Sequence, residues 1–177
     1  ARPEAMDDLF IDLFLEAHDS APEQIILDVD ATDDPLHGHQ EGRFYHGYYR
    51  SYCYLPLYIF CGEHLLCARL RSANQDGAAG TVEELARIIQ RIRLRWPKTP
   101  IIVRGDSGFC RDELMAWCEG HAVDFVLGLA KNPRLKKAIV DEMAAAKIQY
   151  EETQLPARVF RDFRYRTLKS WSGERRV

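Results

Sequence analysis

The sequence predicts an α/β domain whose mixed sheet of about five strands, three antiparallel and then parallel, is flanked by helices. Two observations carry this prediction. Short apolar runs rich in β-branched and aromatic residues occupy the first third of the chain, and from residue 81 onward such runs alternate with segments of helical periodicity. With 177 residues, of which 46% are hydrophobic, the chain is long enough to bury one core.

An amphipathic helix is expected over residues 6–18, because apolar residues recur there at helical spacing opposite a row of acids. Its apolar residues are Met6, Leu9, Phe10, Leu13 and Phe14. Such a helix either packs on its own domain, which we expect, or docks on a partner.

Three consecutive strands are expected next. Residues 24–30 form a buried run that ends in acids and leads into a loop rich in turn-forming residues. Residues 48–71 contain two apolar runs separated by the turn-like Cys61-Gly62-Glu63, which indicates an antiparallel hairpin.

Helices and strands alternate in the rest of the domain. Thr81 and Glu84 have the spacing of a capping box, which predicts a helix that begins with Thr81 as its N-cap. This helix is expected to end at residue 95. It is followed by a strand at 100–104, a helix at 112–120, a strand at 122–129, and a helix at 132–146 with Asn132 as its N-cap.

The resulting order, β-β-β-α-β-α-β-α, is that of the ribonuclease-H-like fold. In such a sheet the strand at 24–30 lies beside the strand at 101–104, so acids that follow them meet at the carboxyl edge. Asp30 and Asp106 are therefore a candidate pair of metal ligands, with Asp28 as the fallback for the first position. Two such carboxylates suit Mg²⁺ or Mn²⁺, and a two-metal centre cleaves or transesterifies phosphodiesters.

Five segments carry a resemblance to a known family. The order and spacing of Asp-Val-Asp-Ala-Thr at 28–32, Leu-His-Gly at 36–38, the run from Gly47 to Tyr58, Arg-Leu-Arg at 69–71 and Arg-Gly-Asp-Ser-Gly-Phe at 104–109 resemble the catalytic domain of DDE transposases of bacterial insertion sequences. The resemblance covers roughly residues 24–177.

The resemblance implies a cytoplasmic enzyme of DNA recombination that cuts double-stranded DNA at the ends of its element and joins the freed 3′ hydroxyl to target DNA. Its cofactor would be Mg²⁺ or Mn²⁺, held by Asp30 and Asp106 as two of three catalytic acids. A homodimer in the transposition complex is compatible with this assignment, and a membrane partner is not expected.

The third catalytic acid of the family, a glutamate, has no match in this chain. It lies on a helix after a mostly β insertion, and the basic segment from residue 150 resembles the start of that insertion. We therefore expect three parts: an N-terminal helix and lead-in over 1–23, a ribonuclease-H-like core over 24–149, and a truncated insertion over 150–177. The fragment alone is expected to be inactive.

The formal charge of −3 conceals a gradient, since residues 1–34 carry −10 and residues 155–177 carry +5. The late bases alternate with aromatic residues, which suits binding to phosphates and unpaired bases. The expected DNA-binding residues are Arg158, Arg161, Arg164, Arg166, Lys169, Arg175 and Arg176. A non-catalytic DNA-binding or assembly module is accordingly one alternative function.

A second alternative is a Mg²⁺-dependent phosphatase of the haloacid-dehalogenase type, because Asp28-Val29-Asp30-Ala31-Thr32 also resembles the signature of that family. Asp28 would then be the nucleophile and Asp30 the general acid and base.

The five cysteines include no CxxC pair and indicate reduced thiols of a cytoplasmic protein. No apolar stretch is long enough to span a membrane.

Overall fold

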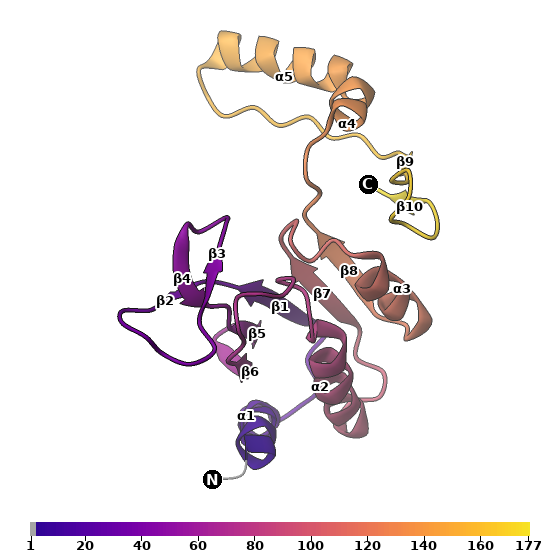
Figure 1. Cartoon of the computed structure of the whole chain (residues 1–177). Helices are drawn as coiled ribbons and strands as arrows, with labels where there is room; N and C mark the ends of the chain where they lie inside the picture. Colours follow the sequence, from indigo (N-terminus) through magenta and orange to yellow (C-terminus); the bar gives the residue numbers. More distant parts are fainter. Residues whose placement is uncertain (1–2) are drawn as a thin grey trace. The chain divides into compact units, whose positions relative to one another are not determined.

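The computed structural model describes residues 3–177 and divides by its contacts into two compact units, residues 1–128 and 129–177. Figure 1 shows the elements of both. The first unit contains α1 (Pro3–Glu16), β1 (Ile25–Ala31), β2 (Asp34–Pro35), β3 (Phe44–His46), β4 (Ser51–Tyr54), β5 (Leu57–Cys61), β6 (His64–Arg69), α2 (Thr81–Arg95), β7 (Ile101–Gly105), α3 (Asp112–Gly120) and β8 (Asp124–Leu127). The second contains α4 (Pro133–Ala138), α5 (Val140–Thr153), β9 (Arg164–Tyr165) and β10 (Arg175–Arg176).

The main sheet has five strands in the order β6-β5-β1-β7-β8. The neighbours β6, β5 and β1 are antiparallel, whereas β1, β7 and β8 are parallel. This succession is the one expected of a ribonuclease-H-like fold, so the predicted fold class is confirmed. Its consequence for the site is that β1, the central strand, has β7 as its parallel neighbour (Figure 1).

Three helices cover one face of this sheet. The alternate residues Ile25, Leu27 and Val29 of β1 point into a core shared with α1, α2 and α3. The intervening residues Ile26, Asp28 and Asp30 belong to the other face, because successive strand side chains alternate. The helical part of the core consists of Ile11, Phe14 and Leu15 of α1, Leu85, Ile88, Ile89 and Ile92 of α2, and Leu114 and Cys118 of α3.

Helix α1 exists as predicted but buries a different face. Its buried residues include Ile11 and Leu15, whereas Met6, Leu9 and Leu13 are each 52% exposed. Of the predicted apolar face, Phe14 is buried as expected, but the placement of Met6, Leu9 and Leu13 on the buried side was wrong. Ion pairs explain the rotation: the row of acids turns toward arginines of β6 and α2, through the pairs Asp7–Arg69, Asp8–Arg87 and Asp12–Arg91.

The capping box predicted at the start of α2 was also wrong. The N-cap is Gly80, in a left-handed conformation at φ 76°, and Thr81 is buried inside the first turn. The Glu84 carboxylate instead accepts hydrogen bonds from Arg69 and, at 3.0 Å, from Nη2 of Arg87. Arg69 of β6 and Arg87 of the same helix thus take the side chain that the capping box would use.

A second small sheet, with the strand order β2-β4-β3, occupies residues 34–54. The sequence predicts a loop after residue 30 and the beginning of a hairpin at residue 48 in this part of the chain. It continues directly from the end of β1. Cys53 and Leu55 form a minor core with Ala73, against which Ala31 and Tyr49 pack. The small sheet is therefore fixed to the carboxyl end of the central strand.

The second unit differs from its prediction in detail. The single helix expected at 132–146 is two helices, because Ile139 leaves the helical conformation between α4 and α5. Asn132 is the N-cap as predicted, with Oδ1 accepting a hydrogen bond from the Leu135 N–H at 3.1 Å. By contacts the unit begins at residue 129, earlier than the boundary at 149 that the sequence suggests. The functional three-part division remains a prediction.

All five cysteines are free, and all lie in the first unit. Burial raises the pKa of Cys67 and of Cys118 to about 12. Within the described residues, no helix is both long and apolar enough to cross a membrane.

Candidate active site

Asp30 and Asp106 come from two adjacent parallel strands. The register pairs Asp28 with Arg104 and Val29 with Gly105, and each candidate aspartate follows the last of these pairs by one residue. Neighbouring strands lie about 4.8 Å apart. The structure therefore brings both side chains to the carboxyl edge of the sheet, where both are exposed to solvent.

Close packing fixes the turn that holds Asp106. Positions 105 and 128 are glycines. A Cβ atom at position 105 would lie 2.7 Å from Cγ2 of Val29, and a Cβ atom at position 128 would lie 2.8 Å from the backbone nitrogen of Ser107. Oδ1 of Asp106 accepts a hydrogen bond from the Gly108 N–H at 2.7 Å. Only glycine permits these approaches at 105 and 128, and the carboxylate is held while Oδ2 stays available.

Asp28 is bound by an arginine of the neighbouring strand. Both of its carboxylate oxygens accept hydrogen bonds from Arg104, one of them from Nη2 at 2.8 Å. The hydrogen bond and the charge of Asp28 raise the pKa of Arg104. By contrast, the carboxylate of Asp30 has no hydrogen bond or ion pair among the residues that the structure describes. This difference favours Asp30 over the fallback as a ligand.

Tyr49 and Asp33 are two members of this edge that the sequence did not single out. The Tyr49 hydroxyl donates a hydrogen bond to the Ala31 carbonyl at 3.3 Å, one residue beyond Asp30. Burial raises the pKa of Tyr49, and the negative charges of Asp33, Asp30 and Asp106 raise it further. Tyr49 thus stays a neutral hydrogen-bond donor in the field of three carboxylates.

The donor set fits a hard divalent cation only in part. Asp30 and Asp106 supply exposed carboxylate oxygens, and Mg²⁺ needs only one or two such protein ligands when waters and phosphate oxygens complete its shell. Throughout residues 3–177, no group of three histidine, cysteine, aspartate or glutamate side chains is placed to hold a metal ion. Glu142, one of the unmatched glutamates, pairs with Arg161 in the second unit.

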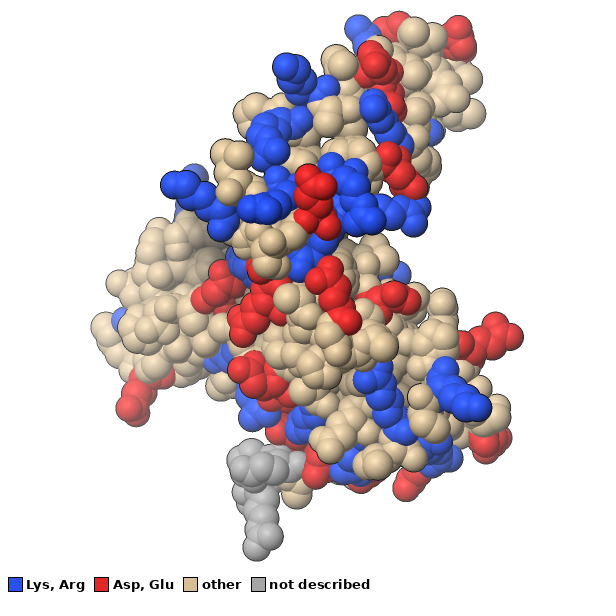
Figure 2. All heavy atoms as spheres, turned by 90° about the vertical axis from the view of Figure 1, so that its right-hand side faces the viewer, with Lys and Arg blue, Asp and Glu red and all other residues tan. Residues whose placement is uncertain are grey.

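The basic residues of the second unit fall into two groups. Arg161 pairs with Glu142, Arg176 pairs with Asp162, and Arg175 is buried with its guanidinium over the Trp171 ring. The remaining four predicted DNA-binding residues are exposed, and the structure gives their side chains no ion pair within its described part: Arg158, Arg164, Arg166 and Lys169. Figure 2 shows many Lys and Arg side chains at the surface of the chain, with Asp and Glu among them.

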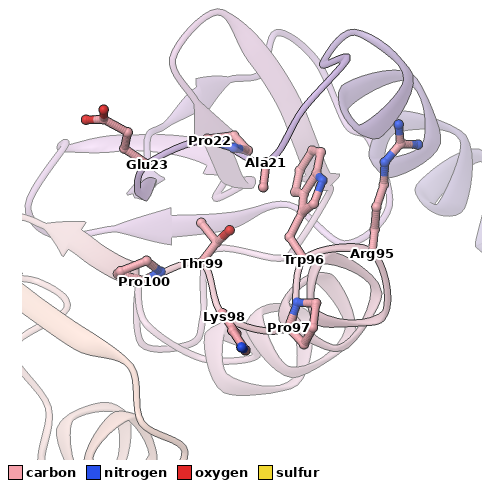
Figure 3. Close-up of a pocket in the computed structure, with 9 residues that line it drawn as sticks. All are labelled: Ala21, Pro22, Glu23, Arg95, Trp96, Pro97, Lys98, Thr99 and Pro100. Carbon is pink, nitrogen blue, oxygen red and sulfur yellow. The ribbon is translucent and has the colours of Figure 1, made fainter.

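A pocket of about 310 Å³ lies at the opposite, amino-terminal end of β1 and β7. It is formed by residues 21–23, ahead of β1, and by residues 95–100, between α2 and β7 (Figure 3). Trp96, which is buried, forms its floor with the guanidinium of Arg95 5.4 Å from the ring centroid. Glu23 is its one acidic lining residue, so it offers no paired carboxylates for a metal ion.

Comparison with known proteins identifies one family, and two distantly similar solved structures are among those that match. The family described as "Transposase DDE domain group 1" matches residues 1–177. No curated protein has a matching sequence. The catalytic domain of the Mos1 mariner transposase is 10% identical with a TM-score of 0.44, covering 86% of this chain and 73% of its own. A chain of the simian T-cell lymphotropic virus intasome in complex with the PP2A regulatory subunit B56 gamma is 12% identical, with a TM-score of 0.37. The match covers 76% of the present chain and 44% of that one.

Proposed function

Since the chain belongs to the transposase DDE domain family, group 1, we propose that its acidic sheet edge supplies two of the three acids with which an insertion-sequence transposase cleaves DNA strands and transfers them to a target. The observation that carries this proposal is the position of Asp30 and Asp106, each one residue beyond a β1–β7 register pair. The two carboxylates lie where α/β sheets place their ligands.

The chain's own residues position the reacting groups. The Gly108 N–H holds the Asp106 carboxylate, and the Asp28–Arg104 pair removes a neighbouring negative charge from competition for a cation. Two adjacent carboxylates repel each other, so the site gains most from a divalent cation. Two Mg²⁺ or Mn²⁺ ions held there would activate the attacking hydroxyl and stabilise the leaving 3′ oxygen.

In the cleavage step, a water oxygen would form a bond to the phosphorus while the bond from phosphorus to the 3′ oxygen breaks, and the 3′ oxygen would take up the proton that the water loses and leave as a hydroxyl. In the transfer step, the oxygen of that 3′ hydroxyl would form a bond to a phosphorus of the target while this phosphorus loses its bond to the target's own 3′ oxygen, which would take up the released proton and leave as a hydroxyl. The third acid of this mechanism has no counterpart among the residues described. We therefore expect weak metal binding and no strand cleavage by this chain alone.

Double-stranded DNA is the proposed partner, as element ends and as target. The exposed Arg158, Arg164, Arg166 and Lys169 suit phosphate contacts, and two copies of the chain would join two element ends. A cytoplasmic location is consistent with the free cysteines. The phosphatase alternative loses support because its nucleophile, Asp28, is engaged by Arg104.

Mn²⁺ binding, measured by electron paramagnetic resonance on the chain as it stands, tests this proposal. Asp30→Asn and Asp106→Asn should each weaken binding at least about tenfold, whereas Asp124→Asn, at the other end of the sheet, should leave it unchanged. Equal binding by all four proteins would overturn the proposal. Hydrolysis of p-nitrophenyl phosphate that is lost in Asp28→Asn would instead support the phosphatase.

A further inference from the structure

The small sheet next to the acidic edge is unusually rich in exposed aromatic side chains. Residues 34–54, called the aromatic sheet below, contain five of the eight tyrosines of the chain and Phe44. The exposed fractions are 42% for Phe44, 57% for Tyr45, 84% for Tyr48 and 49% for Tyr52. Aromatic rings usually contribute to a core, so a group of exposed ones indicates a binding surface.

Two of these rings form one continuous patch. Tyr45 and Tyr52 are register partners on β3 and β4, with ring centroids 5.6 Å apart at an interplanar angle of 70°. The guanidinium of Arg43 lies 4.5 Å from the centroid of the Tyr52 ring. The patch therefore combines planar apolar faces with a cation, the combination that binds unpaired nucleotides.

Tyr48 lies at the tip of the turn between β3 and β4. The turn is closed by a hydrogen bond from the Arg50 N–H to the His46 carbonyl at 2.8 Å, with Arg50 in a left-handed conformation at φ 54°. The Tyr48 ring contacts that of Tyr49 edge-to-face, with centroids 5.0 Å apart. A ring displayed on a closed turn loses little further freedom when a ligand stacks on it.

Tyr49 connects this tip to the acidic edge. Its hydroxyl is bonded to the carbonyl of Ala31, the residue after Asp30, and its ring packs in the minor core with Cys53 and Leu55. The exposed ring of Tyr48 is therefore one side chain away from the edge that carries the two aspartates.

We propose that the aromatic sheet is a stacking surface for unpaired nucleotides of the DNA strand that enters the acidic edge. The Tyr48 ring would take the base nearest the site, Tyr45 and Tyr52 would take bases further along, and Arg43 and Arg50 would contact phosphates. Stacking uses the π-face that every base has, so the surface selects unpaired strands rather than a sequence. This inference rests on the function proposed above.

Fluorescence anisotropy of a labelled oligothymidine, recorded in EDTA, tests the inference without requiring metal or cleavage. Tyr48→Ala and the double variant Tyr45→Ala, Tyr52→Ala should each weaken binding about fivefold or more, as loss of one stacked base does. Tyr48→Phe, which keeps the ring, should bind as the unchanged chain does. Tyr150→Ala, which removes a half-exposed tyrosine of α5, is the matched control.

Three outcomes separate this inference from the proposed function. Unchanged oligothymidine affinity in both tyrosine variants would overturn the stacking surface, even if the aspartate variants lose Mn²⁺. Loss of affinity in these variants while the aspartate variants keep Mn²⁺ would overturn the metal site and leave the surface standing. If Tyr48→Ala reduces self-association in sedimentation and leaves oligothymidine affinity unchanged, the surface pairs two copies of the chain and the inference is wrong.

Discussion

The two compact units of the chain differ in net charge and in how much of each is buried. Residues 1–128 carry twelve bases and twenty-one acids and bury their apolar residues in one large and one minor core. Residues 129–177 carry twelve bases and six acids, and their buried side chains are those of Tyr165, Trp171 and Arg175. The first unit can thus hold carboxylates rigidly at a sheet edge, whereas the second offers positive charge on a lightly packed scaffold.

The two units also differ in whether their basic side chains are paired with acids. In the first unit arginines such as Arg69, Arg87 and Arg104 are matched to acids: Arg69 and Arg87 pair with Asp7 and Asp8 of α1, and Arg104 of β7 pairs with Asp28 of β1. In the second unit four predicted DNA-binding cations have no acid partner in the part of the chain described. Charge serves folding in one unit and is available for a polyanion in the other.

The largest expected effect is on the core of the first unit. Leu27→Ala should lower the free energy of unfolding by about 2–5 kcal/mol, because it leaves a cavity beneath the central strand. Met143→Ala, on the exposed surface of α5, should change it by less than about 0.5 kcal/mol. Labelling of Cys67 and Cys118 during urea unfolding reports on the first unit alone, and equal losses in both variants would contradict the contrast.

The next effect is on duplex DNA binding by the second unit. If Arg158, Arg164, Arg166 and Lys169 each contact a phosphate, raising salt from 50 to 200 mM should weaken binding roughly 100-fold. Replacing all four by glutamine should remove most of this salt dependence. Arg87→Gln in the first unit is the control, since Glu84 already binds that guanidinium. A salt dependence that survives the four changes would place the DNA elsewhere.

The smallest effect concerns an ion pair in the first unit, Asp76 with Arg111, joined at 2.9 Å. Burial raises the pKa of Asp76, but the hydrogen bonds from Arg111 and the Ala78 N–H outweigh it, so the pKa is lowered from 3.8. A lowered carboxyl pKa stabilises the fold above the ordinary value, and this stabilisation is lost as the pH falls below it.

Asp76→Asn should therefore cost less than about 1 kcal/mol at pH 7, because both side chains are half exposed. The difference between variant and unchanged chain should be smaller in urea unfolding at pH 3 than at pH 7, because the stabilisation is lost as the pH falls through the lowered pKa of Asp76. A difference that is the same at pH 7 and pH 3 would mean that Asp76 acts through something other than its charge.

Much of the fold follows from the sequence, because buried strands and amphipathic helices repeat with distinct periods. The acids after two apolar runs predicted that Asp30 and Asp106 lie side by side, since parallel strands end at one edge. Their role as ligands remains a prediction. The sequence placed the strand at 24–30 beside the strand at 101–104 because the succession of elements is that of the ribonuclease-H-like fold.

Other features depend on contacts between distant residues. The face that α1 buries is set by ion pairs to arginines more than sixty positions away, which no local pattern contains. Gly128 lies against the Asp106 turn, and Tyr49 reaches Ala31, only because the sheet brings them together. The aromatic sheet was missed because its exposed rings do not alternate with polar residues as in a half-buried strand.

Asp30 and Asp106 are proposed to hold a divalent cation between them. Anomalous diffraction at the manganese edge, from crystals of the chain soaked in Mn²⁺, locates such an ion. We expect a peak within ligand distance of both carboxylates that disappears in Asp106→Asn. A peak elsewhere in the chain, or none at the carboxyl ends of β1 and β7 at saturating Mn²⁺, would contradict it.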